Sequence, residues 1–135
     1  MKFMKFSIET KGFNEVIDIT DKVREIVRKA KVSDGLCVVF CPCSTCAITT
    51  IEFEEGAIQD LKRILDKIAP VGDNYEHCKK WGDCNGYAHI RSALLKPFFC
   101  CPIENGDLAL GTWQQLVFID FDNRARKREI IVRIV

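Results

Sequence analysis

The sequence lacks the features that would place the protein in a membrane or on a nucleic acid. It has no run of about 18 uncharged apolar residues, the length that a membrane-spanning helix needs. Its 20 basic and 19 acidic residues leave a net charge of only +1, so no overall positive field would attract nucleic acid or an anionic membrane. The lysines near the N-terminus are not followed by the apolar segment of a secretion signal. We therefore expect a cytoplasmic protein.

Familiar phosphate-binding motifs are also missing. The chain contains neither a glycine-rich phosphate loop nor an aspartate-rich magnesium motif. Internal repeats and linkers are absent as well. What is present is a composition of 47% hydrophobic and 29% charged residues over 135 positions, which is typical of a globular protein. We expect a single domain over residues 1–135.

The hydrophobic pattern predicts an α+β fold. Amphipathic helices are predicted at residues 20–31, with Thr20 as the N-cap, and at residues 55–68, and a shorter helix is predicted at residues 88–95. Strands at both ends of the chain, with helices between them, favour mixed or antiparallel sheets packed with about three helices. Strands are predicted at residues 2–10, 17–20, 36–41, 46–51, 98–103, 116–121 and 129–135.

Two segments do not fit the regular pattern. Residues 71–87 show little apolar periodicity, and a loop of this length in a compact domain is functional or partly mobile. The basic cluster at residues 124–128 is interpreted as a polar turn before the final strand rather than as a phosphate-binding patch.

The chain has only two histidines, and both lie in or beside the irregular segment. His77 and His89 flank Asp83, and Glu76 precedes the first of them. Imidazole is a common metal ligand and the usual general acid or base near neutral pH. A histidine taken alone is more often a hydrogen-bonded structural residue, but the shared placement of these two near Asp83 and Glu76 narrows the difference between that interpretation and a functional one.

Cysteine is abundant, and the cluster Cys41-Pro-Cys43-Ser-Thr-Cys46 is the most notable part of this set. Cys43 lies in a short polar break between two buried strands, where its thiolate can ligate zinc or act as a nucleophile. In an extended chain Cys41 and Cys43 share a face while Cys46 points to the other, so all three need not meet one ion. Cys41 and Cys46 are therefore interpreted as small buried apolar side chains. Without a secretion signal, a disulfide framework would need a host such as a hyperthermophile.

Three motifs occur in an order that resembles the YjbQ-like family, which is named for a secondary thiamine-phosphate synthase activity. They are Pro42-Cys43-Ser44-Thr45, then Asn85-Gly86-Tyr87-Ala88-His89, and above all the Gly-Thr-Trp-Gln segment at residues 111–114. By itself the last motif indicates only a turn with an aromatic anchor. The resemblance covers nearly the whole chain.

The resemblance implies a YjbQ-like α+β fold, a homotrimer and a polar pocket that can hold zinc or another divalent metal. The family usually has a histidine where this chain has Cys43, and His77 and His89 match the other two family histidines. A thiolate can replace imidazole in a zinc site, but a general base at this position would be changed or lost.

Two functions follow as hypotheses. In the first, the protein is an enzyme with thiamine-phosphate synthase activity on a small phosphorylated substrate, with His77 and His89 as catalytic groups and with Asp83 or Glu52 orienting a ligand. In the second, the protein is a non-catalytic zinc-binding oligomer whose metal shell is closed by Cys84 or Cys78. The expected metal ligands are Cys43, His77 and His89, and the expected substrate-binding residues are Thr45, Asn85, Thr112, Trp113 and Gln114.

Overall fold

The predicted α+β class is confirmed by the computed structural model, which describes residues 2–135. Four helices are present, one more than expected: α1 (Thr20–Ala30), α2 (Glu55–Ile68), α3 (Glu76–Trp81) and α4 (Gly86–Leu95). The strands are β1 (Lys2–Thr10), β2 (Glu15–Asp18), β3 (Gly35–Phe40), β4 (Cys46–Ile51), β5 (Phe98–Glu104), β6 (Asp107–Leu108), β7 (Gln115–Asp120) and β8 (Arg126–Ile134).

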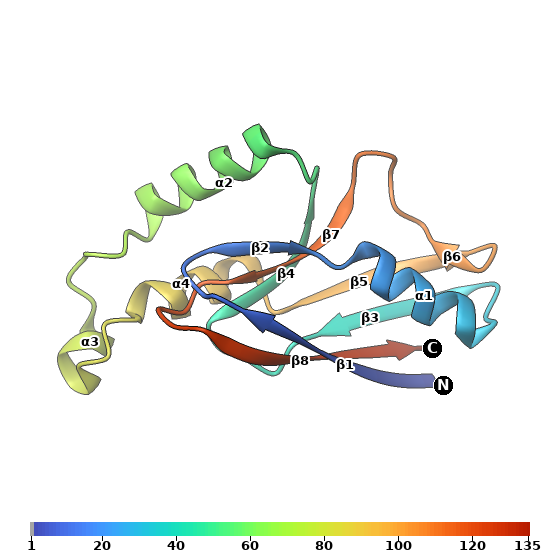
Figure 1. Ribbon diagram of the computed structural model, residues 1–135, viewed down its shortest axis with the longest axis horizontal. Helices are drawn as coiled ribbons and strands as arrows, with labels where there is room; N and C mark the ends of the chain where they lie inside the picture. Colours follow the sequence, from blue (N-terminus) through green and yellow to red (C-terminus); the bar gives the residue numbers. More distant parts are fainter. Residues whose placement is uncertain (1) are drawn as a thin grey trace.

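The strands form two antiparallel sheets. The larger sheet has the order β1-β8-β3-β5-β6, and the smaller one has the order β2-β7-β4 (Figure 1). Helix α1 contributes Val23 and Val27 to a core that also contains Val39 of the larger sheet and Phe118 of the smaller sheet. The smaller sheet is therefore joined to the larger one through the main hydrophobic core.

The smaller sheet is covered on both faces. Ile48 and Phe118 face the main core, whereas Ala47 and Val117 face a second core that includes Tyr87 and Ala88 of α4. Burial on both faces explains why the sequence of β7 is almost continuously apolar instead of alternating. The same burial makes any charged residue in this strand exceptional.

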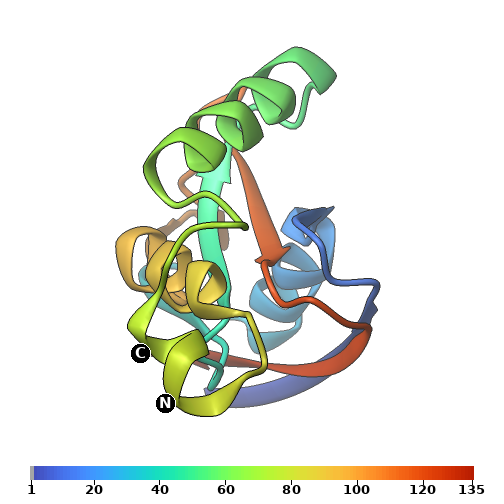
Figure 2. The ribbon, with the colours of Figure 1, turned by 90° about the vertical axis from the view of Figure 1, so that its left-hand side faces the viewer.

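Helix α2 differs from the other long helices because it projects away from the sheets, whereas α4 lies beside β4 (Figure 2). Helix α2 has the predicted apolar side, but Leu65 is the only residue of the helix that is fully buried. Ile64 and Ile68 remain 43% and 58% exposed. No helix within residues 2–135 combines the length and the apolar character needed to cross a membrane.

Three local predictions need correction. Thr20 is the first residue of α1 and not its N-cap; its backbone and hydroxyl groups donate to the Asp18 carboxylate at 2.9 and 2.6 Å. The segment expected to be a loop contains α3, and α4 begins at Gly86, two residues earlier than expected. Strand β6 was not predicted because two residues are too short to show a period.

Candidate functional site

The site lies where β4 begins and β7 ends. Cys46 pairs with Asp120 in the antiparallel register, so the loop that carries Cys43 and Thr45 lies next to the turn that follows β7. Phe121 donates its backbone N–H to the Thr45 carbonyl at 3.0 Å, which fixes this turn against the loop. The main-chain pairing therefore brings together residues that are about 75 positions apart in the sequence.

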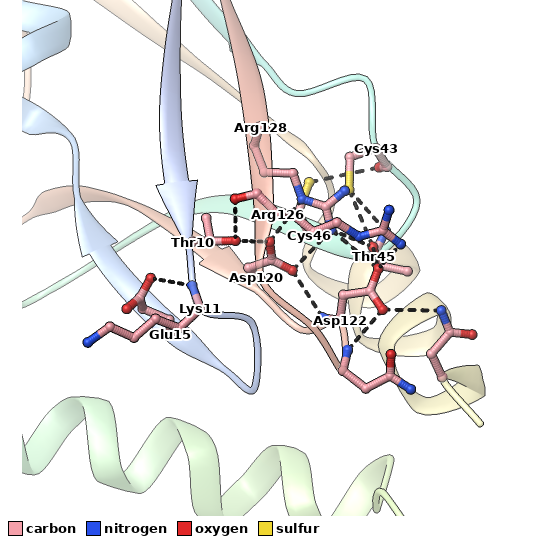
Figure 3. A network of polar contacts seen from close by, with 12 residues as sticks. Thr10, Lys11, Glu15, Cys43, Thr45, Cys46, Asp120, Asp122, Arg126 and Arg128 are labelled. Atoms are coloured by element: carbon pink, nitrogen blue, oxygen red, sulfur yellow. Dashed lines mark hydrogen bonds and ion pairs between the residues drawn. The ribbon is translucent and has the colours of Figure 1, made fainter. Parts of the chain in front are cut away.

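A buried network of charged residues occupies this position (Figure 3). Arg128 donates to both oxygens of Asp120, at 2.9 and 3.1 Å, and reaches Asp122 at 3.5 Å. Arg126 donates to Asp122 at 2.9 Å, and the Thr10 hydroxyl donates to Asp120 at 2.6 Å. Both carboxylates are almost completely buried, and each is paired with a guanidinium: Asp120 with Arg128, and Asp122 with both arginines.

Asp122 connects the network to the Cys43 loop and to α4. Its carboxylate accepts hydrogen bonds from the Thr45 hydroxyl at 3.1 Å and from the Asn85 amide at 3.3 Å. Burial acts to raise the pKa of Asp122, but hydrogen bonds from the Asn123 backbone, Asn85 and Arg126 outweigh it, so the pKa lies below its ordinary value. Asp122 is therefore a buried anion at neutral pH.

Cys43 lies beside Thr45 at the half-exposed edge of the network. Its sulfur accepts the Thr45 backbone N–H at 3.3 Å and lies 3.5 Å from the Thr45 hydroxyl. Hydrogen bonds from the thiols of Cys41 and Cys46, together with those from Thr45, hold the pKa of Cys43 well below its ordinary value. The hydrogen bond with Cys43 raises the pKa of Cys41, and hydrogen bonds with Cys41 and Cys43 raise the pKa of Cys46. The arrangement therefore favours the thiolate form at Cys43 over its two neighbours.

His77 and His89 come together, as their shared segment suggested. Their ring centroids are 4.4 Å apart, with the planes inclined at 39°. His77 Nδ1 lies 3.3 Å from the Asp83 carboxylate, but the angle is not that of a hydrogen bond, and this nitrogen is buried without a hydrogen-bond partner. The Asp83 carbonyl accepts the Asn123 amide at 2.8 Å, which ties this segment to the turn containing Asp122.

Asn85 lies between the histidine pair and the network. It is the N-cap of α4, and its backbone carbonyl accepts the N–H of His89 one turn later, at 3.4 Å. The side chain is 8% exposed; its amide donates to Asp122, while its Oδ1 is buried without a partner. A buried acceptor without a donor is costly, so Oδ1 is an open hydrogen-bonding position in this part of the structure.

The remaining predicted substrate residues lie elsewhere. Gln115 pairs with Ile51 at the opposite end of β4 and β7, which places Thr112, Trp113 and Gln114 about 17 Å from the Cys43 end at about 3.4 Å per residue. Trp113 is 72% exposed and lines an open depression of about 470 Å³ with Thr112 and Phe53. The Gln114 side chain already has hydrogen-bond partners in the chain. Its oxygen accepts the Gly111 backbone N–H and its amide nitrogen donates to the Thr50 hydroxyl, each at 3.0 Å.

Among residues 2–135, one set of three or more potential metal ligands has all its ligand atoms within 4.8 Å of one another. It consists of Cys41, Cys43 and Cys46. The sequence suggested that the three sulfurs need not meet, because an extended chain would point Cys46 away from Cys41 and Cys43. The chain is not extended here, since the Cys43 N–H donates to the Cys41 carbonyl at 2.8 Å and closes a tight turn. The set Cys43, His77 and His89 is not such a group and stays a prediction.

Sequence reasoning missed the charged members of the site. Asp120 and Asp122 were assigned to a strand end and a turn, and Arg126 and Arg128 to a polar turn. One signal was available in the spacing. Asp120 and Asp122 are two positions apart, and so are Arg126 and Arg128. In an extended chain, two residues at this spacing point to the same face. Two acids and two bases spaced in this way favour a buried ion-pair network over a solvated turn.

Comparison with known proteins agrees with the fold and names no function. Residues 4–135 match the family model described as UPF0047 protein YjbQ-like. A UPF0047 protein of Archaeoglobus fulgidus is 38% identical over 130 residues, which cover 96% of this chain and 98% of the relative. One of Methanocaldococcus jannaschii is 33% identical over 132 residues, covering 97% and 92%.

Solved structures show the same architecture. A hypothetical protein from Aeropyrum pernix K1 superposes with a TM-score of 0.91 at 27% identity, covering 100% of this chain and 98% of the other. An uncharacterized conserved protein of the YjbQ/UPF0047 family from Clostridium acetobutylicum superposes with a TM-score of 0.88 at 37% identity, covering 98% and 99%.

Proposed function

Since this chain belongs to the UPF0047 family of YjbQ-like proteins, we propose that it is an enzyme that acts on a small phosphorylated substrate at the end of β4 and β7 that carries Cys43. The observation that carries this proposal is the pair of buried, unpartnered atoms, His77 Nδ1 and Asn85 Oδ1, on the segment that contacts Asp122. A protein interior rarely leaves such atoms unsatisfied unless a ligand completes them.

The charge of the site supports dependence on a metal ion. Asp120, Asp122 and the Cys43 thiolate outnumber Arg126 and Arg128, and the Thr45 hydroxyl is already engaged with Asp122 and Arg128. A phosphate group would therefore meet an excess of negative charge and would bind here only together with a cation.

The ligands in this proposal are Cys43, His77 and His89, a mixed sulfur and nitrogen set that suits zinc or another divalent metal. Such an ion supplies a positive charge for phosphate oxygens. The other residues of the chain have separate roles in this proposal. Asn85 accepts a hydrogen bond from the substrate, and Asp83 orients His77 as a ligand.

The activity implied by the family is the joining of a pyrimidine pyrophosphate to a thiazole phosphate. We expect chelator-treated protein to form thiamine phosphate only after zinc or another divalent metal is restored, as measured by chromatography of the product. Replacement of His89 with alanine should lower the rate by a factor on the order of 100 or more, because a ligand or general acid is lost.

Cys43→Ala should remove bound metal and activity together, whereas Cys100→Ala is the matched control, since Cys100 is an exposed thiol on β5. Metal analysis would be made on the same samples. Stoichiometric metal with no turnover on the two phosphates would favour the alternative of a non-catalytic zinc-binding protein. Full activity in chelator-treated protein would contradict the proposal.

We also propose that the protein forms a homotrimer in which the apolar side of α2 packs on a neighbouring subunit. The support is that Ile64 and Ile68 are exposed on a helix that projects from the domain.

Light scattering should therefore give three times the chain mass of 15.4 kDa. The double substitution Ile64→Glu and Ile68→Glu should shift the mass to that of one chain with an unchanged circular dichroism spectrum, because charged side chains would be buried in the interface. Gln59→Glu adds a charge on the other side of the helix and should leave the trimer intact. A wild-type protein with the mass of one chain would contradict the trimer.

A further inference from the structure

We propose that Cys41, Cys43 and Cys46 form a binding site for one soft metal cation, of which Cu(I) is the type, held by three sulfur atoms. This site goes beyond the proposed function because it does not use the histidines. The three sulfurs lie within 4.8 Å of one another, and none of them is in a disulfide bond. With metal–sulfur bonds of about 2.3 Å, three sulfurs around one ion would be about 4 Å apart, so only a small contraction is needed.

The backbone holds the three cysteines in place. Cys41 donates its N–H to the Pro97 carbonyl at 2.9 Å, and the tight turn from Cys41 to Cys43 brings the chain back on itself. The Cys46 thiol lies 3.9 Å from the Cys43 carbonyl, which closes the loop from the other side. The sulfurs are therefore preorganised by main-chain contacts, as a binding site requires.

The environment favours a soft ion over a hard one. Cys41 and Cys46 are 1% and 0% exposed and belong to the main hydrophobic core, whereas Cys43 is partly exposed and offers a route of entry. Thiolates prefer soft cations to magnesium or calcium, which need oxygen ligands.

Arg128 connects the sulfur group to the charged network. It donates to the Thr45 hydroxyl at 2.9 Å, and this hydroxyl lies 3.5 Å from the Cys43 sulfur. Arg128 has limited freedom to move, because Asp120 binds it through two hydrogen bonds. Its charge is shared with Asp120 and Asp122, so a cation bound by the three sulfurs would itself supply the positive charge that the site needs.

Other cysteines do not form a comparable group. Cys37 and Cys101 are cross-strand neighbours in the larger sheet and are both buried, but within residues 2–135 no third ligand meets them. Cys100 is exposed on the same strand as Cys101. These residues serve as internal controls.

The test is a titration of reduced, metal-free protein with Cu(I) under anaerobic conditions, and with Cd(II) as a probe of thiolate-to-metal charge-transfer absorption. We expect one ion per chain. Cys41→Ala, Cys43→Ala and Cys46→Ala should each weaken Cu(I) binding by a factor on the order of 100, whereas Cys100→Ala should not change it. Full binding by Cys41→Ala or Cys46→Ala would overturn the site.

A second measurement does not depend on the variants folding. In the wild-type protein, Cu(I) should protect Cys43, the partly exposed member of the group, from alkylation in mass spectrometry, while the exposed Cys100 stays reactive. Equal reactivity of Cys43 with and without Cu(I) would contradict the proposal. His89→Ala should retain Cu(I) at the sulfurs although it loses the metal of the proposed enzyme, and Cys46→Ala should show the reverse, so the two proposals can fail independently.

Discussion

Replacement of Arg128 with methionine is expected to lower the free energy of unfolding by about 3–5 kcal/mol at neutral pH. Arg128 neutralises Asp120 and Asp122, whose carboxylates are 0% and 1% exposed. Methionine fills much of the same volume but leaves Asp120 without a guanidinium partner and Asp122 with Arg126 alone. Urea denaturation followed by circular dichroism would measure the loss.

Arg124→Met is the matched control, because Arg124 is exposed in the turn that precedes β8. A loss of more than about 0.5 kcal/mol in this control would show that the effect is not specific to the buried network. A loss below about 1 kcal/mol for Arg128→Met would mean that Asp120 and Asp122 do not depend on Arg128.

The effect of Arg128→Met should also depend on pH. In the wild-type protein the pKa of Asp122 is lowered by its hydrogen bonds, so its stabilisation is present above the unfolded carboxyl pKa of about 3.9 and is lost as the pH falls through the lower folded value. In Arg128→Met, Asp122 loses a nearby positive charge and would protonate at higher pH, which removes part of the unpaired buried charge. The difference in stability between the two proteins should therefore narrow as the pH is lowered from 7 to about 4.

Replacement of Arg91 with methionine is expected to cost about 2–4 kcal/mol and to loosen α2. The Arg91 side chain is completely buried and donates twice to the Ala69 carbonyl at the end of α2, at 3.0 and 2.9 Å. It also donates to Asn14 at 2.8 Å, and its guanidinium lies 5.2 Å from the centre of the Tyr87 ring. Most of the loss comes from the unsatisfied Ala69 carbonyl, because the partner Asp66 is 62% exposed.

Hydrogen exchange would separate this effect from a general loss of stability. The amides of α2 should lose protection more than those of β7 in Arg91→Met, since α2 has few other contacts with the sheets. Arg63→Met, on the exposed side of α2, should leave both regions unchanged. Equal loss of protection in α2 and β7 would show that Arg91 supports the whole domain instead of α2.

Much of the fold could be read from local patterns. The apolar runs of β3, β4 and β7 and the amphipathic period of α2 are strong signals, and their bounds agree with the structure to within a residue or two. The errors occur where the signal is short or irregular: α3 has six residues and no fully buried side chain, so it shows no amphipathic pattern.

The site was only partly predictable. His77 and His89 were expected together because they share an irregular segment, and they are in contact. Asp120, Asp122 and Arg128 were missed because their importance comes from burial, which the sequence does not state.

The sequence by itself determined which segments form strands and helices, and which side chains are rare enough to be functional candidates. The tertiary structure alone decided which of those side chains meet. The antiparallel register places the Cys43 loop beside the turn after β7, and it separates both from Trp113 by the length of the strands. A tight turn brings together the sulfurs of Cys41, Cys43 and Cys46, which an extended chain would hold apart. Secondary structure follows from local propensity and periodicity, whereas proximity between distant residues depends on strand order and backbone turns, which no local pattern specifies.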